Sequence, residues 1–197
     1  MSSQMSTVPR QNLNPRQAET VERLFGEAAV LLEEVGHEQL TIRMVAARAG
    51  VSPATAYTYF ASKDHLFAEL FWRLVNADEG PQLTGGTPTE RLRQLVRHLA
   101  ELVAAAPALA GAVNKSLLGS DPEVDRLRRD IGLLWVDRFR EAIGPDADPE
   151  LITTLTLVIS GGMLQAGVGV FTYAELGDTL ETAVDVIMTG RGPDGSR

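Results

Sequence analysis

The stretch from Leu40 to Phe67, LTIRMVAARAGVSPATAYTYFASKDHLF, holds the side chains with the clearest chemistry in this sequence. Hydroxyl groups recur on Thr55, Tyr57, Thr58 and Tyr59, in a segment that the pattern predicts to be short and largely exposed. Such groups can donate hydrogen bonds to phosphates and base edges. Two short helices joined by a tight turn are typical of a helix-turn-helix, whose second helix enters the major groove of DNA.

Turn chemistry predicts where these two helices begin and end. Thr41 can cap the first helix, and Gly50 follows its end, where a left-handed residue is favoured. Ser52 can cap the second helix, and Pro53 takes its first position, where a missing N–H costs nothing. The four residues together predict a well-defined helix-turn-helix.

The run VSPATAYTYFASKDHLF resembles the signature of TetR-family transcriptional regulators. That signature is valine-serine, a variable residue, Gly-Thr-Leu-Tyr, a variable residue, Tyr-Phe, and then a Ser-Lys-Asp/Glu-x-Leu helix start. The sequence departs from it at Ala54, often glycine in the family, and at Ala56, often leucine. The specific match covers about residues 16–74, and it keeps Val51, Ser52, Thr55, Tyr57, Tyr59, Phe60, Ser62, Lys63, Asp64 and Leu66.

The resemblance implies that Thr55, Tyr57 and Tyr59 touch DNA, together with Arg43 from the preceding helix and Lys63 from the next helix start. Arg43 could make a bidentate contact with guanine, and the alternatives are a phosphate contact or a solvated charge. Tyr57 could donate to a phosphate or lay its ring on a thymine methyl.

One tyrosine could instead belong to the core; we expect Phe60 to be the buried anchor and Tyr57 to be exposed. Thr58 can also reach the groove, and Lys63 can clamp a phosphate beside a helix N-terminus. The predicted DNA-contacting set is Arg43, Ser52, Thr55, Tyr57, Thr58, Tyr59 and Lys63.

The charge distribution is compatible with DNA binding even though the net charge is −8. Residues 1–65 hold six Lys/Arg against seven Asp/Glu, which gives −1, and the remainder holds 12 against 19, which gives −7. Phosphate contacts need a local cationic face rather than a basic protein. Arg10, Arg16, Arg43 and Lys63 could supply that face.

Several function classes find no support in the sequence. There is no cysteine, and His37, His65 and His98 lack metal-ligand spacing. Gly161-Gly162 does not follow a predicted strand, so it is no nucleotide motif. We therefore expect no enzyme, cofactor or metal site. No signal peptide or membrane-spanning segment is predicted, since the longest apolar run, Leu155–Phe171, is shorter than the ~20 residues required; we expect a cytoplasmic protein.

Hydrophobic spacing predicts an all-α chain of about nine helices. The expected helices span about 14–35, 41–48, 53–59, 62–76, 87–106, 107–118, 121–144, 148–171 and 174–188. The expected organisation is a disordered arm (1–13), a three-helix DNA-binding domain (14–65), a helical effector-binding and dimerisation domain (66–190) and a flexible tail (191–197).

The C-terminal helices could enclose a ligand pocket, which needs a mostly apolar wall and a few polar anchors. His98, Asn114 and Gln165 are candidate polar groups. Plain core packing is the alternative, with His98 satisfied on its helix. The predicted lining is Trp72, Leu95, His98, Leu99, Leu102, Val113, Leu117, Trp135, Phe139 and Met163.

The last two helices are more apolar than one buried face requires, which predicts a homodimer interface. Close approach of a partner helix would offset the cost of Gly161 and Gly162 in mid-helix, roughly 1 kcal/mol each. The alternative is an ordinary monomer core. The candidate interface is Leu151, Leu155, Val158, Ile159 and Met163 on one helix, and Leu176, Leu180, Val184 and Ile187 on the other.

These expectations combine into a homodimeric repressor that binds palindromic double-stranded DNA. A small apolar or amphipathic effector would release it. The alternative is a DNA-binding protein that is ligand-independent or regulated by a partner.

Overall fold

The computed structural model describes residues 14–145 and 147–190, and within these ranges the chain is all α-helical, with nine helices and no strand. The predicted arm (1–13) and tail (191–197) lie outside the described residues. The helices are α1 (Pro15–Gln39), α2 (Ile42–Arg48), α3 (Pro53–Tyr59), α4 (Lys63–Ala77), α5 (Pro88–Ala104), α6 (Pro107–Leu117), α7 (Pro122–Ile143), α8 (Pro149–Gly167) and α9 (Leu176–Gly190).

Most of these helices begin at a side chain that accepts a hydrogen bond from the first turn, an interaction that typically contributes about 1 kcal/mol. Asn14 and Thr87 each form a complete capping box, with Gln17 and Glu90 as the partners. The remaining capping residues with such a bond are Thr41, Ser52, Ser62, Asp121 and Asp148.

Two helix ends differ from the expected ones. The first helix is interrupted at Gly36, whose φ of 74° is left-handed, and a further turn reaches Gln39. The eighth helix ends at Gly167 and not near Phe171. Gly169 has a φ of 80°, so the backbone turns there and apolar composition alone overestimates the helix.

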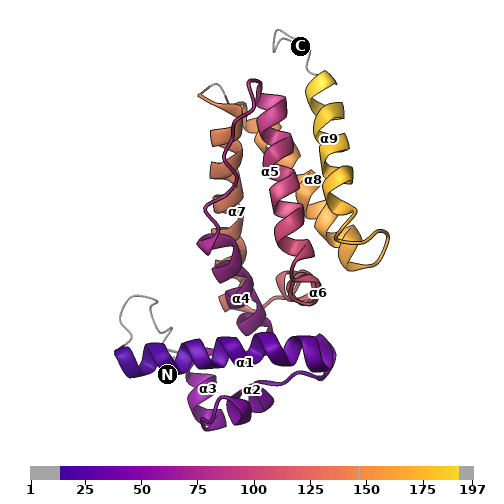
Figure 1. Cartoon of the computed structure of the whole chain (residues 1–197). Coiled ribbons are helices and arrows are strands. Elements are labelled where there is room, and N and C mark those ends of the chain that lie inside the picture. The colour runs from indigo at the N-terminus through magenta and orange to yellow at the C-terminus, as the bar shows by residue number, and fades with distance from the viewer. Residues whose placement is uncertain (1–13, 146, 191–197) are drawn as a thin grey trace.

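Figure 1 shows the arrangement of the helices in two parts. α1 crosses the base of the molecule with α2 and α3 below it, and we call these three helices the head. α5, α6, α7, α8 and α9 form a helical bundle above, which we call the body. α4 runs upward from the head along the body, and α6 lies at the base of the body next to α1 (Figure 1).

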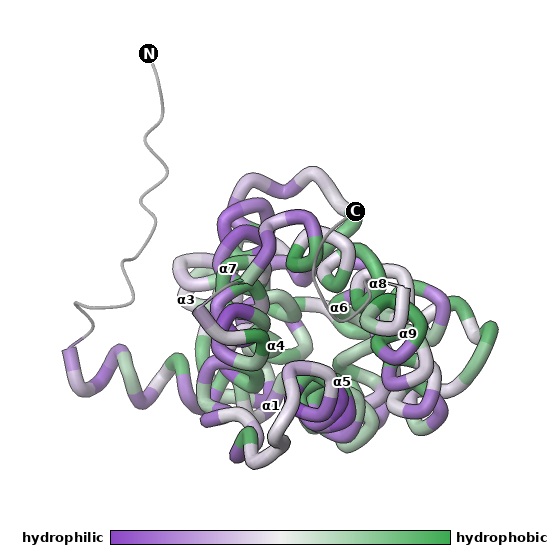
Figure 2. Tube along the Cα trace, turned by 90° about the horizontal axis from the view of Figure 1, so that it is seen from above, coloured by the Kyte–Doolittle hydropathy of each residue, from purple (hydrophilic) through white to green (hydrophobic). Residues whose placement is uncertain are grey.

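The buried side chains form one large cluster in each part, and α4 contributes to both. Leu66 and Phe67, near the start of α4, pack with the head residues. Phe71 and Val75, further along, pack in the body with Trp135 and its neighbours. The joint between head and body is therefore a continuous helix anchored in both cores. Viewed from above, hydrophobic segments also reach the outer edge of the molecule beside α8 and α9 (Figure 2).

Within the described residues, no single helix is both long and apolar enough to cross a membrane. α5 and α6 meet the length and composition criteria only as a pair, and they are bent by 101° at their junction.

Candidate functional site

The helix-turn-helix forms through the capping and turn residues expected for it. Thr41 accepts a hydrogen bond from the Met44 N–H at 3.2 Å and starts α2. Gly50 follows α2 with a φ of 67°, a conformation that costs glycine little. Ser52 then accepts a hydrogen bond from the Thr55 N–H at 3.1 Å and starts α3. These predictions are confirmed.

α3 is held against the head by one face and leaves the other face open. Phe60 is only 2% exposed, and its ring meets the Phe25 ring edge-on at 5.1 Å between centroids. Ala56 is also buried. Tyr57 is 48% exposed, so the prediction that Phe60 anchors the helix while Tyr57 faces outward is confirmed. Figure 1 shows that α3 lies at the end of the molecule farthest from the body, where a duplex could approach it.

The other predicted DNA-contacting residues of this segment differ in exposure. Ser52 and Thr58 are exposed, whereas Thr55 and Tyr59 are half-buried. Tyr59 packs against the core of the head, so part of its ring serves stability. Ser52 is the capping residue of α3, and this role occupies its oxygen. Contact of these residues with DNA stays a prediction.

The cations of the head divide into paired and unpaired groups. Arg48 forms ion pairs with Glu27, at 3.0 Å, and with Glu34. The hydrogen bond from Arg48 holds the pKa of Glu34 below its usual value. Arg43 is exposed and has no ion-pair partner among residues 14–145 and 147–190. It is therefore the cation of the helix-turn-helix that is available to a nucleic acid.

Lys63 is engaged inside the chain. Its Nζ donates to the backbone carbonyls of His37, at 2.9 Å, and Glu38, at 3.4 Å. The ammonium group thus stabilises the end of α1, where carbonyl groups lack helical partners. An ammonium has three N–H donors, so one is left for another acceptor. A phosphate contact by Lys63 stays a prediction, and it would be additional to this structural role.

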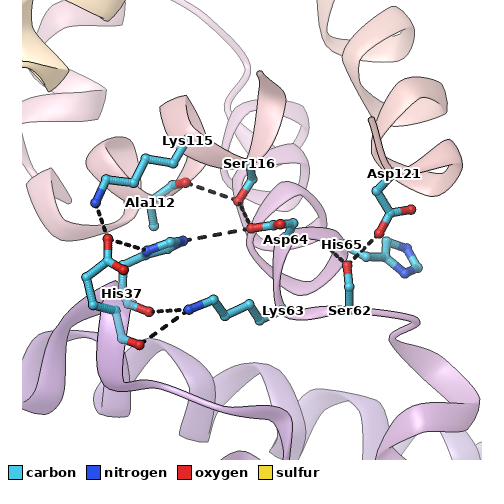
Figure 3. A network of polar contacts seen from close by, with 10 residues as sticks. His37, Ser62, Lys63, Asp64, His65, Ala112, Lys115, Ser116 and Asp121 are labelled. Atoms are coloured by element: carbon cyan, nitrogen blue, oxygen red, sulfur yellow. Dashed lines mark hydrogen bonds and ion pairs between the residues drawn. The ribbon is translucent and has the colours of Figure 1, made fainter. Parts of the chain in front are cut away.

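A polar network links the head to the body around the start of α4 (Figure 3). The Ser116 hydroxyl on α6 donates to the Asp64 carboxylate at 2.9 Å, and Lys115 forms an ion pair with Glu38. His37 lies between two of these carboxylates, 3.5 Å from Glu38 and 3.8 Å from Asp64. The network joins the end of α1, the start of α4 and the end of α6.

A second link in Figure 3 joins α4 to α7. The Ser62 hydroxyl donates to the Asp121 carboxylate at 2.5 Å. The Glu123 N–H donates to the same carboxylate at 2.9 Å. Burial alone would raise the pKa of Asp121, but these hydrogen bonds outweigh it and lower the pKa below its usual value. The sequence placed Ser62 and Asp121 only at the starts of two expected helices. Their pairing spans 59 positions, for which the sequence pattern carries no signal.

The predicted ligand-lining residues mostly pack against one another in the body. Leu95, Leu99, Val113, Trp135, Phe139 and Met163 belong to its buried cluster, and Trp72, Leu102 and Leu117 pack against that cluster. His98 forms a 2.8 Å hydrogen bond with Asp78, which also pairs with Arg138 at 3.0 Å. His98 is thus a satisfied helix histidine, the alternative that the sequence left open. Which residues contact a ligand stays a prediction.

Among the described residues, the body lines a pocket at each of two places on its surface. One, of about 310 Å³, lies where the α4–α5 loop passes α7, and of the predicted lining residues it includes Leu95. The other, of about 600 Å³, lies between the α5–α6 turn and the α8–α9 loop. Next to it, Asn114 donates to the Tyr173 hydroxyl at 2.9 Å and to the Met163 carbonyl at 2.6 Å. Gln165, the other candidate polar anchor, is exposed.

The predicted dimer interface is wrong, because its residues face the core of their own chain. Seven of them are buried within the chain, and Val158 and Ile187 are half-buried against the same cluster. The buried seven are Leu151, Leu155, Ile159, Met163, Leu176, Leu180 and Val184. They join α8 and α9 to the body because both helices are apolar on more than one face, and hydrophobic spacing alone does not distinguish the faces.

The outer face of α8 carries a different set of apolar side chains. Leu157, Leu164 and Val168 are 68%, 41% and 69% exposed, and we call this set the α8 stripe. Gly161 lies between them at helical spacing, and a Cβ placed there would meet nothing within 4 Å. Gly162 faces inward, where a Cβ would lie 3.0 Å from Leu176. Of the two glycines, therefore, one is required for packing inside the chain and the other lies on the outer face.

Among the residues that the structure describes, no group of three or more histidine or carboxylate side chains is placed to hold a metal ion.

Comparison with known families supports the helix-turn-helix assignment of the head. The model of the family described as bacterial regulatory proteins, tetR family, matches residues 24–70, which include both helices of the helix-turn-helix. Among solved structures, a TetR transcriptional regulator from Rhodococcus sp. RHA1 superimposes with a TM-score of 0.71 at 22% identity, covering 89% of this chain and 98% of that one. The Thermus thermophilus FadR repressor in complex with lauroyl-CoA gives 0.64 at 24% identity, covering 86% and 93%.

Relatives in sequence extend the match over both parts of the chain. An uncharacterized HTH-type transcriptional regulator of Mycobacterium tuberculosis, Rv0767c, is 42% identical over 181 residues, which cover 90% of this chain and 84% of the relative. The HTH-type transcriptional repressor KstR of Mycolicibacterium smegmatis is 29% identical over 137 residues, covering 68% and 67%. These relatives are transcriptional regulators and not enzymes. With its exposed, capped helix-turn-helix and its all-α body, the chain belongs to the TetR family of bacterial transcriptional regulators.

Proposed function

We propose that the protein is a cytoplasmic, homodimeric repressor that binds an inverted-repeat operator. The observation that carries this proposal is the pairing of an exposed α3 in the head with an exposed α8 stripe in the body. One α3 of seven residues spans only about 10 Å and reads a few base pairs. Two copies held at a fixed distance read two half-sites, about 34–36 Å apart or a multiple of that distance.

The α8 stripe supports the dimer because contiguous exposed apolar side chains mark interaction surfaces. Leu157 and Leu164 lie on one face of α8, and Val168 directly follows its last residue. Gly161 between them allows a neighbouring backbone to approach closely. A two-fold axis through this face would bring together two copies of the same stripe. In this proposal the axis runs along the direction from body to head, so that both heads lie at the same end of the dimer and face the same duplex.

The effector, in this proposal, is a small molecule with a large apolar part, and it binds in the body. The lauroyl-CoA complex of the FadR neighbour supports an acyl-type ligand as the first candidate. The ligand would shift a two-state equilibrium towards a dimer whose head spacing no longer fits the operator. To change the ratio of the two states from 99:1 to 1:99, the ligand must bind the second state more tightly by about 5.5 kcal/mol.

The joint around α4 is the proposed route from body to head. α4 is anchored in both cores, and its first turn is tied to α6 through Asp64 and Ser116 and to α7 through Ser62 and Asp121. A displacement of α6 or α7 by a ligand would therefore move the start of α4, and the head would move with it.

A second candidate function is a DNA-binding protein without a small-molecule effector, or one regulated by a partner. The specific observation in its favour is that nine of the ten predicted lining residues pack in or against the buried cluster of the body. In that case the body serves dimerisation alone.

The experiment begins with selection of bound sequences from random duplex DNA by the full-length protein. We expect an enriched inverted repeat, bound by two subunits in analytical ultracentrifugation. Acyl-CoA thioesters and free fatty acids of increasing chain length are then titrated into the complex. Release of the duplex together with a higher melting temperature of the protein supports the effector model. Compounds that bind and stabilise the protein without changing DNA affinity support the second candidate.

A further inference from the structure

A pocket of about 310 Å³ opens at the joint between head and body, where α1 meets α4 and α6. These three helices contact one another pairwise, and α6 lies at the base of the body next to α1 (Figure 1). We call this hollow the joint pocket. Its lining is Ala29, Val30, Leu32 and Glu33 from α1, Leu70 from α4, and Ala106 and Leu109 from the start of α6.

The wall of the joint pocket is apolar apart from one side chain. Six of its seven residues are alanine, valine or leucine, and Glu33 is the seventh. Leu32 belongs to the buried core of the head, whereas Val30 is 46% exposed, so the pocket extends from that core to the solvent. Small-molecule sites of about 300–1,000 Å³ combine a mostly apolar wall with a few polar groups, and they often lie between domains. The joint pocket has this composition, this size and this location.

Glu33 decides which charge a ligand of this pocket should carry. It follows Val30 by three positions and Ala29 by four, so all three side chains share one face of α1. The adjacent Glu34 forms an ion pair with Arg48. Glu33 itself has no ion-pair partner within residues 14–145 and 147–190. An exposed carboxylate without a counter-ion therefore lies at the edge of an apolar pocket, and its complement is a cation attached to a hydrocarbon.

We propose that the joint pocket is a second small-molecule site, which binds an aliphatic amine. The ammonium group pairs with Glu33, and the hydrocarbon chain lies against Leu70 and Leu109. Such a ligand contacts α1 of the head and α6 of the body at the same time, so it restrains the joint between them. The inference goes beyond the proposed function, because the site lies outside the proposed effector site and requires neither an operator nor a dimer.

The test titrates butylamine, hexylamine, octylamine and 1-octanol into the full-length protein by isothermal calorimetry, below the concentrations at which they form micelles. Each buried methylene should lower the dissociation constant by up to about fourfold until the chain fills the pocket. Octylamine carries an ammonium group at neutral pH, as a lysine side chain does. It should bind roughly two- to fivefold more tightly than 1-octanol, which matches its chain length and lacks the charge, because ion pairs at exposed sites are weak.

Three variants on α1 assign the binding to this pocket. Glu33→Gln should remove the advantage of octylamine over 1-octanol and leave the affinity for 1-octanol unchanged. Glu19→Gln is the matched control, at an exposed carboxylate of the same helix outside the pocket, and it should change neither affinity. Ala29→Phe should fill the pocket and abolish the binding of both compounds. All three positions are exposed, and melting curves show whether each variant folds.

Hydrogen exchange locates the bound amine independently. Octylamine should slow amide exchange in α1 and α6 around the pocket, and it should leave α8 and α9 unchanged. No binding of octylamine, or binding that survives Ala29→Phe, would overturn the site. Equal affinity of wild type and Glu33→Gln for octylamine would overturn the proposed class of ligand. Loss of operator binding is a separate result, because it would remove the proposed function and leave this inference standing.

Discussion

The head and the outer face of α8 both present apolar side chains to solvent, but their surroundings differ. In the head, the exposed Tyr57 lies on a helix that also carries two threonine hydroxyls, and the adjoining α2 carries the exposed Arg43, as suits a surface that meets a charged, grooved duplex. The α8 stripe has Gly161 within it, and α8 carries no Lys or Arg that could meet a phosphate. Exposed apolar area alone therefore does not identify a partner; the polar groups around it distinguish a DNA surface from a protein–protein surface.

The sharpest test of this comparison uses two neighbouring positions on α8. Ile159→Asp places a charge among buried side chains, and we expect it to destabilise the subunit by more than about 3 kcal/mol. Leu157→Asp, on the exposed stripe, should leave the helical content and folding of the subunit intact. It should weaken dimerisation at least about 30-fold, which corresponds to 2 kcal/mol. Denaturant melts and sedimentation velocity measure the two effects.

If Leu157→Asp loses as much stability as Ile159→Asp, Leu157 contributes to the folding of the subunit and not to an interface. Unchanged dimerisation of Leu157→Asp would move the interface elsewhere on the molecule.

The head offers a similar pair in Tyr57 on α3 and Phe60, which directly follows this helix. Phe60→Ala removes a buried ring that contacts Phe25, and we expect a loss of about 3–5 kcal/mol in stability of the head. Tyr57→Ala should leave the melting temperature close to that of wild type and weaken operator binding about tenfold, or 1.4 kcal/mol. Thermal melts and anisotropy titrations provide the readouts. Full operator affinity in Tyr57→Ala would remove this residue from the DNA surface.

The same contrast separates local features, which the sequence predicts, from long-range packing, which it does not. Caps and turns are local, so Thr41, Gly50 and Ser52 were enough to predict α2 and α3, and the order of the helices followed from spacing. The orientation of α8 was not predictable in this way, because its apolar residues surround the helix and tertiary packing decides which face is buried. The contacts of Ser62 and Asp64 with the body connect residues more than 50 positions apart, so no local pattern encodes them.

The adjacent glycines of α8 give a smaller effect. Gly162→Ala would place a Cβ 3.0 Å from Leu176 and 3.2 Å from Leu180, so these side chains must shift and stability should fall by roughly 1 kcal/mol. Gly161→Ala meets open space and should stabilise an isolated subunit by about 0.5–1 kcal/mol. If a partner helix approaches Gly161, the same substitution should weaken the dimer. Thermal melts at protein concentrations below and above the dimer dissociation constant separate the effect on subunit stability from the effect on dimerisation.

The smallest effect concerns the link between α4 and α7. Because hydrogen bonds lower the pKa of Asp121 in the folded protein, its contribution is present above the unfolded pKa and is lost as pH falls through the folded value. Asp121→Asn keeps a capping side chain and removes the charge. We expect it to cost at most about 1.5 kcal/mol at neutral pH. The difference from wild type should begin to shrink only below about pH 4 and should disappear below the pKa that Asp121 has in the folded protein.

The control is Asp137→Asn, at a carboxylate that forms an exposed pair with Arg140 within α7. This substitution should change the stability of the protein little, both at neutral pH and in acid. A difference between wild type and Asp121→Asn that persists into acid would assign the effect to the side-chain shape and not to its charge.

The most direct test of the central claim compares the wild-type protein on the selected full inverted repeat and on one half-site of equal length. Two heads joined through the body should bind the full site as a dimer, with a dissociation constant at least about 100-fold lower than on the half-site. Sedimentation gives the mass of the protein–DNA complex, and fluorescence anisotropy gives its dissociation constant. A single subunit bound with equal affinity to both duplexes would contradict the account.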